Sequence, residues 1–383
     1  MDFIFVLSIL ILGFIFANGN NFSKTDKKKL NLLWMFHICT SIYYYFFTRN
    51  GGGDAWRYWV FAREMTFADF IKNLFTTNGS EFMDTLNYIP ANLMGMSFFA
   101  NTLFYGLLGF IAFILLYRIC IDTIPYNSQF YKHNLFPLLL FLPNLHFWSS
   151  GIGKDTMLFL CIIMIGYGIM RTSRRFPMIV VGLLLAYVIR PHVALMLVGS
   201  FGLTYFLNSK TPLYQRAFFI VLLIMTVVFM LPVVLEFTKI EEASLDGFEQ
   251  FSGKHANFLT NAGSAVDIAS YPYPLKVLTF LYRPFFFDIN GIPAVIASFE
   301  NLFLVLLSVQ LFRKRPFAAF KAAPVVIQGL FIFFASGALV FSTTMSNLGI
   351  ILRQRNMFLP GFILFVLWCF SYKQQINLRK NNA

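Results

Sequence analysis

Long apolar segments alternate with short polar stretches along the whole chain. The segments are about 13 to 22 residues long, which suits helices that cross the hydrocarbon core of a bilayer. A half-buried helix of a soluble domain is instead expected to carry a polar face. The pattern predicts an all-α, polytopic membrane protein with about eleven spans, at approximately residues 3–18, 30–47, 101–117, 135–148, 156–170, 177–189, 193–208, 217–235, 291–312, 323–341 and 356–371.

The composition excludes a soluble globular domain. Hydrophobic residues make up 58% of the chain and charged residues only 12%, against about 25% charged residues in ordinary globular domains. The four cysteines lie in or beside apolar segments, which indicates core packing and no disulfide framework or metal site. The net charge of +13 comes mainly from short loops, so it is interpreted as a topology signal and no nucleic-acid partner is expected.

Basic residues are concentrated on alternate loops, and this bias predicts the orientation of the chain. The lysine cluster at 24–29 follows the first span, which places the amino terminus outside and the tail from Lys373 in the cytoplasm. Two long loops, 48–90 and 236–274, then fall on the outer side. We therefore expect one membrane domain over residues 1–383 with two long extracytoplasmic loops.

Five polar motifs interrupt the apolar pattern, and the charge bias places all of them at the outer face. Arginine and acidic residues are costly near a bilayer, so their recurrence on one side indicates a shared polar site. The sequence thus favours an enzyme or carrier that handles an anionic substrate at that face. The motifs lie at residues 51–57, 147–155, 189–192, 282–288 and 347–355.

Arg190, Pro191 and His192 form the most informative motif. Proline ends or kinks the helix there, and a guanidinium fixed at such a break can bind a phosphate with two hydrogen bonds. The structural alternative is an interfacial arginine that reaches the headgroups beside a packed histidine. Arg283 repeats the Arg-Pro pattern ahead of an aromatic run, where an amphipathic interfacial helix is the alternative.

Two further motifs carry basic residues on the outer side. Arg353 and Arg355 oppose the positive-inside rule, which anion binding or plain headgroup contact would explain. Lys154 and Asp155 begin a predicted helix that follows Trp148, and a helix amino terminus is suited to bind pyrophosphate. An exposed helix cap is the simpler interpretation of that segment.

Asp54 follows three glycines and is flanked by aromatic residues and Arg57, so its carboxylate could serve as a general base beside a sugar. A glycine-rich turn that leads into an amphipathic helix over 56–74 is equally consistent with this pattern. Glu300 and His37 lie within predicted spans, where pairing with a polar group of a neighbouring helix competes with a functional role. We expect His146 to have a packing role.

The set of outer-face arginines, with an aspartate and a histidine and without a metal-ligand cluster, resembles the bacterial oligosaccharide repeat-unit polymerases. These are the Wzy-type O-antigen and capsule polymerases and their EpsG-like exopolysaccharide relatives. The residues that carry the resemblance are Gly53 and Asp54 with Tyr58, the segment 148–155, the Arg190–His192 motif, Arg353 and Arg355.

The resemblance implies a GT-C-like membrane glycosyltransferase that needs no metal or cofactor. It implies action on undecaprenyl-pyrophosphate-linked glycans at the extracytoplasmic face of the bacterial plasma membrane, in surface polysaccharide biosynthesis. A chain-length regulator and a glycan flippase are then candidate partners. Two other classes stay open: a membrane glycosyltransferase that uses a polyprenyl-phosphate sugar, and a flippase or transporter of lipid-linked glycans.

The expected chemistry assigns roles to the motif residues. Guanidinium groups would stabilise the negative charge that grows on the pyrophosphate leaving group, while a base removes a proton from the acceptor hydroxyl. Asp54, His192 and Arg190 are the predicted catalytic residues. The predicted residues for binding pyrophosphate or glycan are Arg57, Trp148, Lys154, Asp155, Arg283, Arg353 and Arg355.

Overall fold

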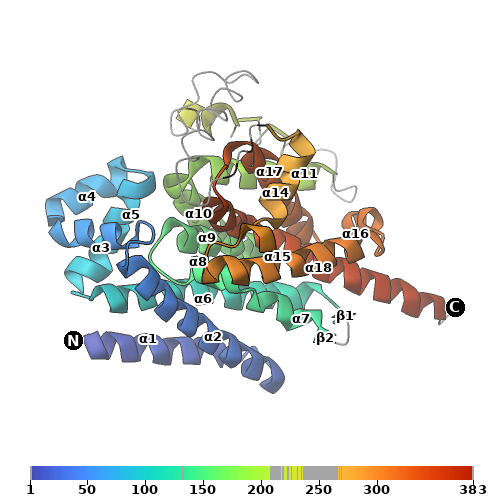
Figure 1. The fold of residues 1–383 in the computed structure, drawn as a ribbon, viewed down its shortest axis with the longest axis horizontal. Helices are drawn as coiled ribbons and strands as arrows, with labels where there is room; N and C mark the ends of the chain where they lie inside the picture. The colour runs from blue at the N-terminus through green and yellow to red at the C-terminus, as the bar shows by residue number, and fades with distance from the viewer. Residues whose placement is uncertain are drawn as a thin grey trace. The chain divides into compact units, whose positions relative to one another are not determined.

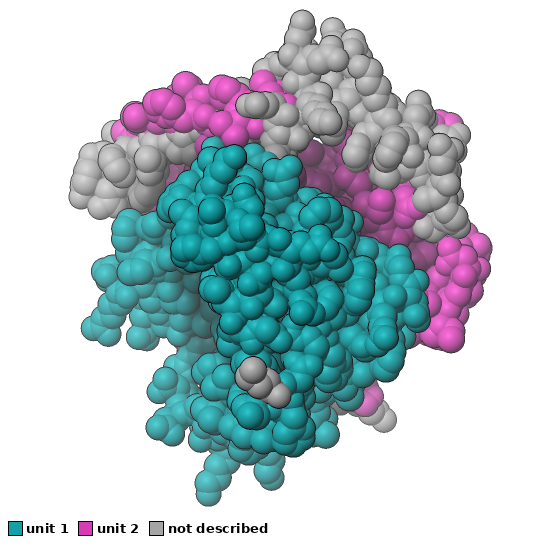
Figure 2. Space-filling view, turned by 90° about the vertical axis from the view of Figure 1, so that its left-hand side faces the viewer, with its two compact units in different colours: residues 1–119, 137–190 teal, residues 120–136, 191–383 magenta. Residues whose placement is uncertain are grey.

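The computed structural model of the protein describes residues 2–130, 133–207 and 270–381, together with scattered positions between 217 and 268. The described part is almost entirely helical, which confirms the predicted all-α class (Figure 1). Two short antiparallel strands, β1 (Gln129–Phe130) and β2 (His133–Asn134), are the exception among these residues. Residue contacts divide the chain into unit 1 (Met1–Ile119 and Pro137–Arg190) and unit 2 (Cys120–Phe136 and Pro191–Ala383), which Figure 2 colours separately.

Five helices of the described part are long and apolar enough to cross a membrane, and each coincides with a predicted span. The length and composition of these helices suit a helical membrane protein. They are α6 (Phe98–Thr123), α10 (Thr172–Ile189), α15 (Ile292–Phe312), α17 (Val325–Thr344) and α18 (Leu348–Asn381).

The sequence predicts two separate spans at 135–148 and 156–170, but the structure divides the first segment and joins its last helix to the second through a sharp bend. Residues 135–149 are divided into α7 (Leu135–Leu138), the 3₁₀ turn η2 (Leu139–Phe141) and α8 (Pro143–Ser149). Phe136 and Leu142 have extended backbone angles because each precedes a proline, which disfavours the helical conformation. Helix α8 meets α9 (Lys154–Ile169) at a bend of 106°, so the pair forms one broken span or a re-entrant segment.

Four other predicted spans are not among the five helices that can cross a membrane. The spans at 3–18 and 193–208 correspond to the shorter apolar helices α1 (Asp2–Ala17) and α11 (Pro191–Leu207). The span at 30–47 lies within the continuous helix α2 (Lys24–Arg49). The span at 217–235 lies largely outside the described residues. The total of about eleven spans and the GT-C-like arrangement stay predictions.

The first predicted long loop, 48–90, folds into three short helices within unit 1. They are α3 (Ala55–Glu64), α4 (Phe67–Thr76) and α5 (Gly79–Tyr88), followed by the π-helical turn η1 (Ile89–Leu93). The single amphipathic helix considered over 56–74 is in fact two helices, because the Thr66 hydroxyl accepts the Asp69 N–H at 3.2 Å and starts a new helix. Helix α5 contacts α3, α4, α9 and α10, so it lies at the centre of this unit.

Close helix packing in unit 2 depends on small residues. A Cβ at Gly361 of α18 would collide with the backbone carbonyl of Leu330 in α17, and one at Gly329 of α17 would enter the Phe201 ring of α11. Glycine therefore allows these helices to approach each other, as small residues do at membrane helix crossings. Helices α14 (Tyr273–Tyr282) and α16 (Pro316–Ala322) and the 3₁₀ turn η3 (Phe286–Asp288) complete the described part of unit 2. The second predicted loop, 236–274, lies mostly outside the described residues.

Candidate functional site

A buried carboxylate on α5, Asp84, lies among several of the predicted site residues in unit 1. Asp84 is 7% exposed, and its Oδ2 is 3.9 Å from the guanidinium of Arg57 on α3. The pKa of Asp84 is raised to about 6, mainly by burial. The nearby charges of Arg57 and Lys154 lower this pKa, and those of Glu81 and Asp54 raise it. The structure thus brings the predicted residues Asp54, Arg57 and Lys154 within electrostatic range of one carboxylate.

The other Asp84 oxygen, Oδ1, is buried and has no hydrogen-bond partner among the described residues. A carboxylate held in this state is a candidate proton acceptor near neutral pH, because an unsolvated and weakly paired anion gains most from taking a proton. Sequence reasoning missed Asp84. Its signal was weak: one of two acids on α5, close to the buried residues Met83 and Asn87.

The start of α9 is tied to the end of α10 by a buried ion pair. The Arg190 guanidinium is 3.4 Å from the Asp155 carboxylate, and both side chains are about nine-tenths buried. Asp155 suits the first turn of α9, where the helix dipole favours an acid. Arg190 follows the last residue of α10 with an extended backbone because Pro191 comes next. The predicted helix break at this proline is confirmed, since α10 ends at Ile189 and α11 begins at Pro191.

The turn between α8 and α9 is fixed by a contact from α2. The Tyr44 hydroxyl donates to the carbonyl of Ile152 at 2.9 Å, and the Tyr44 ring leaves no room for a side chain at Gly151. Trp148 is half-buried in α8, with its ring against that of Phe147. Lys154 is half-buried and is the first residue of α9, so it directly follows the turn that Tyr44 fixes.

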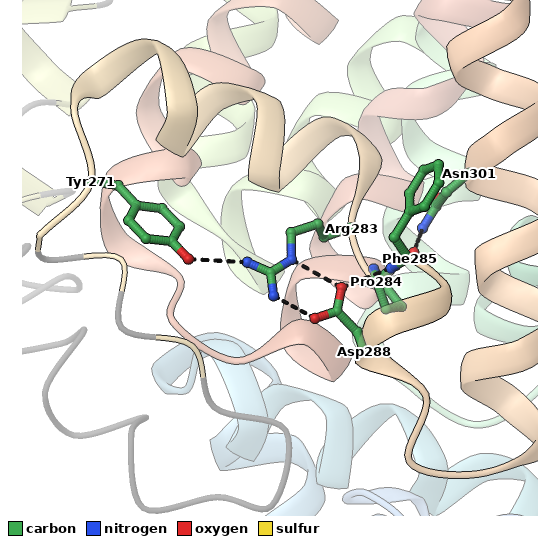
Figure 3. Close-up of polar contacts among 6 residues, drawn as sticks. All are labelled: Tyr271, Arg283, Pro284, Phe285, Asp288 and Asn301. Atoms are coloured by element: carbon green, nitrogen blue, oxygen red, sulfur yellow. Dashed lines mark hydrogen bonds and ion pairs between the residues drawn. The ribbon is translucent and has the colours of Figure 1, made fainter.

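In unit 2 the predicted anion-binding residue Arg283 is engaged by an acid of its own motif. Its Nε donates to Asp288 at 3.0 Å, a second nitrogen donates to the other carboxylate oxygen, and a third donates to the Tyr271 hydroxyl at 3.3 Å (Figure 3). The Asp288 hydrogen bonds raise the pKa of Arg283. Burial alone would raise the pKa of Asp288, but the Arg283 bonds and the Phe285 N–H lower it. Arg283 and Asp288 thus form a bidentate ion pair within the motif.

Arg355 is the most deeply buried of the predicted arginines, with 1% exposure on α18. It donates to the Leu281 carbonyl and to the Asn301 side chain, both at 2.6 Å, and Glu300 of α15 interacts with it electrostatically. This arrangement holds α14, α15 and α18 together. The electrostatic interaction of Glu300 with Arg355 is consistent with pairing between helices, one of the two interpretations of Glu300 that the sequence leaves open.

The two remaining predicted residues of unit 2 lie on α11 and α18. The His192 ring is 5.9 Å from that of Phe341 on α17, and Arg353 is half-buried on α18, two residues before Arg355. The binding roles of Arg283, Arg353 and Arg355 and the catalytic role of His192 stay predictions.

Two histidines that the sequence placed in apolar segments form a buried pair in unit 1. The Nδ1 atoms of His37 on α2 and His146 on α8 are 2.8 Å apart. Each Nε2 faces a backbone carbonyl, that of Gly106 at 3.0 Å for His37 and that of Leu140 at 2.7 Å for His146. Every ring nitrogen thus lies within hydrogen-bonding distance of another polar atom, but two neutral imidazoles carry protons for only two of these three contacts.

No family model, curated protein or solved structure matches this chain. Within the part of the chain that the structure describes, no group of three or more histidines, cysteines or acids is placed to hold a metal ion. The candidate site therefore depends on the geometry of unit 1: Asp84 beside Arg57, with Lys154 and the Asp155–Arg190 pair at the start of α9.

Proposed function

We propose that the chain is a membrane glycosyltransferase that polymerises undecaprenyl-pyrophosphate-linked oligosaccharide repeat units at the outer face of the bacterial plasma membrane. The observation that supports this most is the buried Asp84 carboxylate, with a pKa of about 6, beside the cation of Arg57 and in the field of Lys154. A general base works best when its pKa lies near the working pH. Cations beside it suit a reaction in which an anionic group leaves.

The proposed reaction is a single displacement. Asp84 accepts the proton of an acceptor sugar hydroxyl, and the hydroxyl oxygen forms a bond to the anomeric carbon of the donor sugar. The bond from that carbon to the pyrophosphate oxygen breaks, and the leaving group keeps the electron pair. Arg57 and Lys154 stabilise the negative charge that grows on the pyrophosphate, and removing one such donor typically costs on the order of 3 kcal/mol in the transition state.

This assignment places Asp84 in the role for which the sequence suggested Asp54 or His192. Asp54 is solvent-exposed at the start of α3, whereas Asp84 is buried. Arg190 acts as a positioning residue, because its ion pair with Asp155 fixes the first turn of α9 and hence Lys154.

Two arginines on α3 allow a matched test. Arg57 lies beside Asp84, whereas Arg63 has its guanidinium 4.9 Å from the Trp59 ring and is exposed. With purified protein and lipid-linked repeat units, Arg57→Gln should slow chain elongation about 100-fold, and Arg63→Gln should stay within a few-fold of wild type.

Other products would overturn the proposal. Transfer of one sugar from a polyprenyl phosphate would identify the single-sugar transferase, and movement of the lipid-linked glycan without covalent change would identify a transporter. Equal elongation by the Arg57→Gln variant and wild type would remove Arg57 from the site.

A further inference from the structure

Unit 1 contains a hollow of about 430 Å³ between α3, α4 and α5. This volume lies in the range of about 300–1,000 Å³ that is typical of small-molecule sites. Its polar lining is mostly acidic: Glu64 from α3, Asp69 from α4, and Glu81 and Asp84 from α5 face Arg57 as the single lining cation. With these five side chains charged, the hollow is negative, so it disfavours an anionic acceptor. The pyrophosphate of the donor is assigned to Arg57 and to Lys154, and Lys154 does not line the hollow.

The Asp84 side chain independently indicates that the hollow binds a ligand. Its side chain lines the hollow, is about nine-tenths buried, and has one buried oxygen without a hydrogen-bond donor among the described residues. Leaving a buried acceptor without a donor is unfavourable, and a ligand that donates a hydrogen bond to the carboxylate reduces that cost. Hydroxyl and ammonium groups are donors of the required kind.

The rest of the lining fits a sugar. Phe61 lines the hollow and is 51% exposed, so an aromatic side chain is available to the apolar side of a sugar. Asn73 of α4 and Thr77, which follows that helix, add neutral hydrogen-bonding groups. The acids do not form a metal-binding group, since no set of three or more is close enough among the described residues. They are therefore placed to accept separate hydrogen bonds.

We infer that the hollow between α3, α4 and α5 is the subsite for the acceptor glycan, and that it selects neutral or amino sugars over acidic ones. This inference rests on the proposed function, because it places the acceptor hydroxyl against the Asp84 carboxylate, which lines the hollow. The acidic lining then sets the substrate class by repelling carboxylate-bearing sugars.

Binding of soluble trisaccharides to the purified full-length protein tests this without donor lipid. The probes are trimers of glucose, glucosamine and galacturonic acid, and calorimetry measures their affinity. The glucose and glucosamine trimers should bind, and the galacturonic acid trimer should bind at least about tenfold more weakly. Asp84→Asn should weaken glucose-trimer binding by about tenfold or more, because a hydrogen bond to a charged group is lost.

Two further variants complete the design. The double variant Glu64→Gln/Glu81→Gln leaves Asp84 in place and should reduce the preference against galacturonic acid. Asp122→Asn is the control, since Asp122 is exposed on α6 and does not line the hollow. The inference is overturned if no trimer binds, if the acidic trimer binds as well as the neutral one, or if Asp84→Asn leaves binding unchanged.

The two proposals fail in different ways. Trisaccharide binding that depends on Asp84, with no elongation of lipid-linked units, would retain the sugar site and reject the polymerase. Elongation without such binding would retain the polymerase and reject the hollow as its acceptor subsite.

Discussion

Replacing Asp84 with asparagine should make the protein more stable and less active at the same time. Asparagine keeps the shape of the side chain and removes the charge that burial disfavours. It also removes the ion pair with Arg57, but the Arg57 side chain is 42% exposed, and pairs of that kind contribute only about 0–1 kcal/mol. The net effect on folding is therefore dominated by relief of desolvation.

The magnitude follows from the pKa of Asp84, which burial raises from 3.8 to about 6. Because the folded-state pKa lies above the unfolded value, the folded protein holds this proton more tightly, and stability falls as the pH rises between about 4 and about 6. At about 1.4 kcal/mol per pKa unit, the charged carboxylate lowers the free energy of unfolding by about 3 kcal/mol at pH values above about 7. Asp84→Asn should recover most of that amount.

Thermal unfolding in detergent at two pH values provides the assay. The gain from Asp84→Asn should be about 3 kcal/mol near pH 8 and about half of that near pH 5, and it should vanish below about pH 4. Asp54→Asn is the matched control, because Asp54 is exposed and its replacement relieves no buried charge. Glycan elongation by the Asp84→Asn variant should fall sharply.

Two results would refute this reasoning. A stability gain that is the same at both pH values would show that charge desolvation is not its source. Elongation at the wild-type rate by the more stable Asp84→Asn protein would remove Asp84 as the base, and loss of elongation in Asp54→Asn alone would return that role to Asp54.

Two further predictions concern packing in unit 2, and thermal unfolding measures both. Gly361→Ala should destabilise the protein by about 1–3 kcal/mol or more, because the new methyl group collides with the Leu330 carbonyl. Gly199→Ala is the control: its Cβ has no neighbour within 4 Å, so it should be neutral or stabilise the protein by up to about 1 kcal/mol. Arg355→Lys should cost about 1–3 kcal/mol, because an ammonium lacks the planar fork that reaches both Leu281 and Asn301. Arg353→Lys should cost less; equal losses would contradict the structural role of Arg355.

Local sequence signals predicted several elements well. The spans at 101–117, 177–189 and 291–312 coincide with α6, α10 and α15, because long apolar runs specify helices that can cross a membrane. The break at Pro191 was predicted for the same local reason, since proline cannot continue a helical hydrogen-bond ladder. Segment 135–148 is not one continuous helix, because the residues before Pro137 and Pro143 adopt extended backbone angles.

The candidate site was predicted only in part. Asp54, Arg57 and Lys154 were identified as polar exceptions in an apolar chain, and the structure places them around one carboxylate. Asp84 was missed, since its importance comes from burial by α3 and its other neighbours rather than from any local pattern.

The sequence by itself determined the all-α class, the apolar helices and the sites of proline breaks, because hydropathy and backbone sterics act over a few neighbouring residues. The tertiary structure decided which polar groups meet: Asp84 with Arg57, Asp155 with Arg190, and Arg355 with Asn301. Such pairs join residues far apart in the chain. Their pKa values and hydrogen bonds arise from desolvation that exists only once the helices have packed.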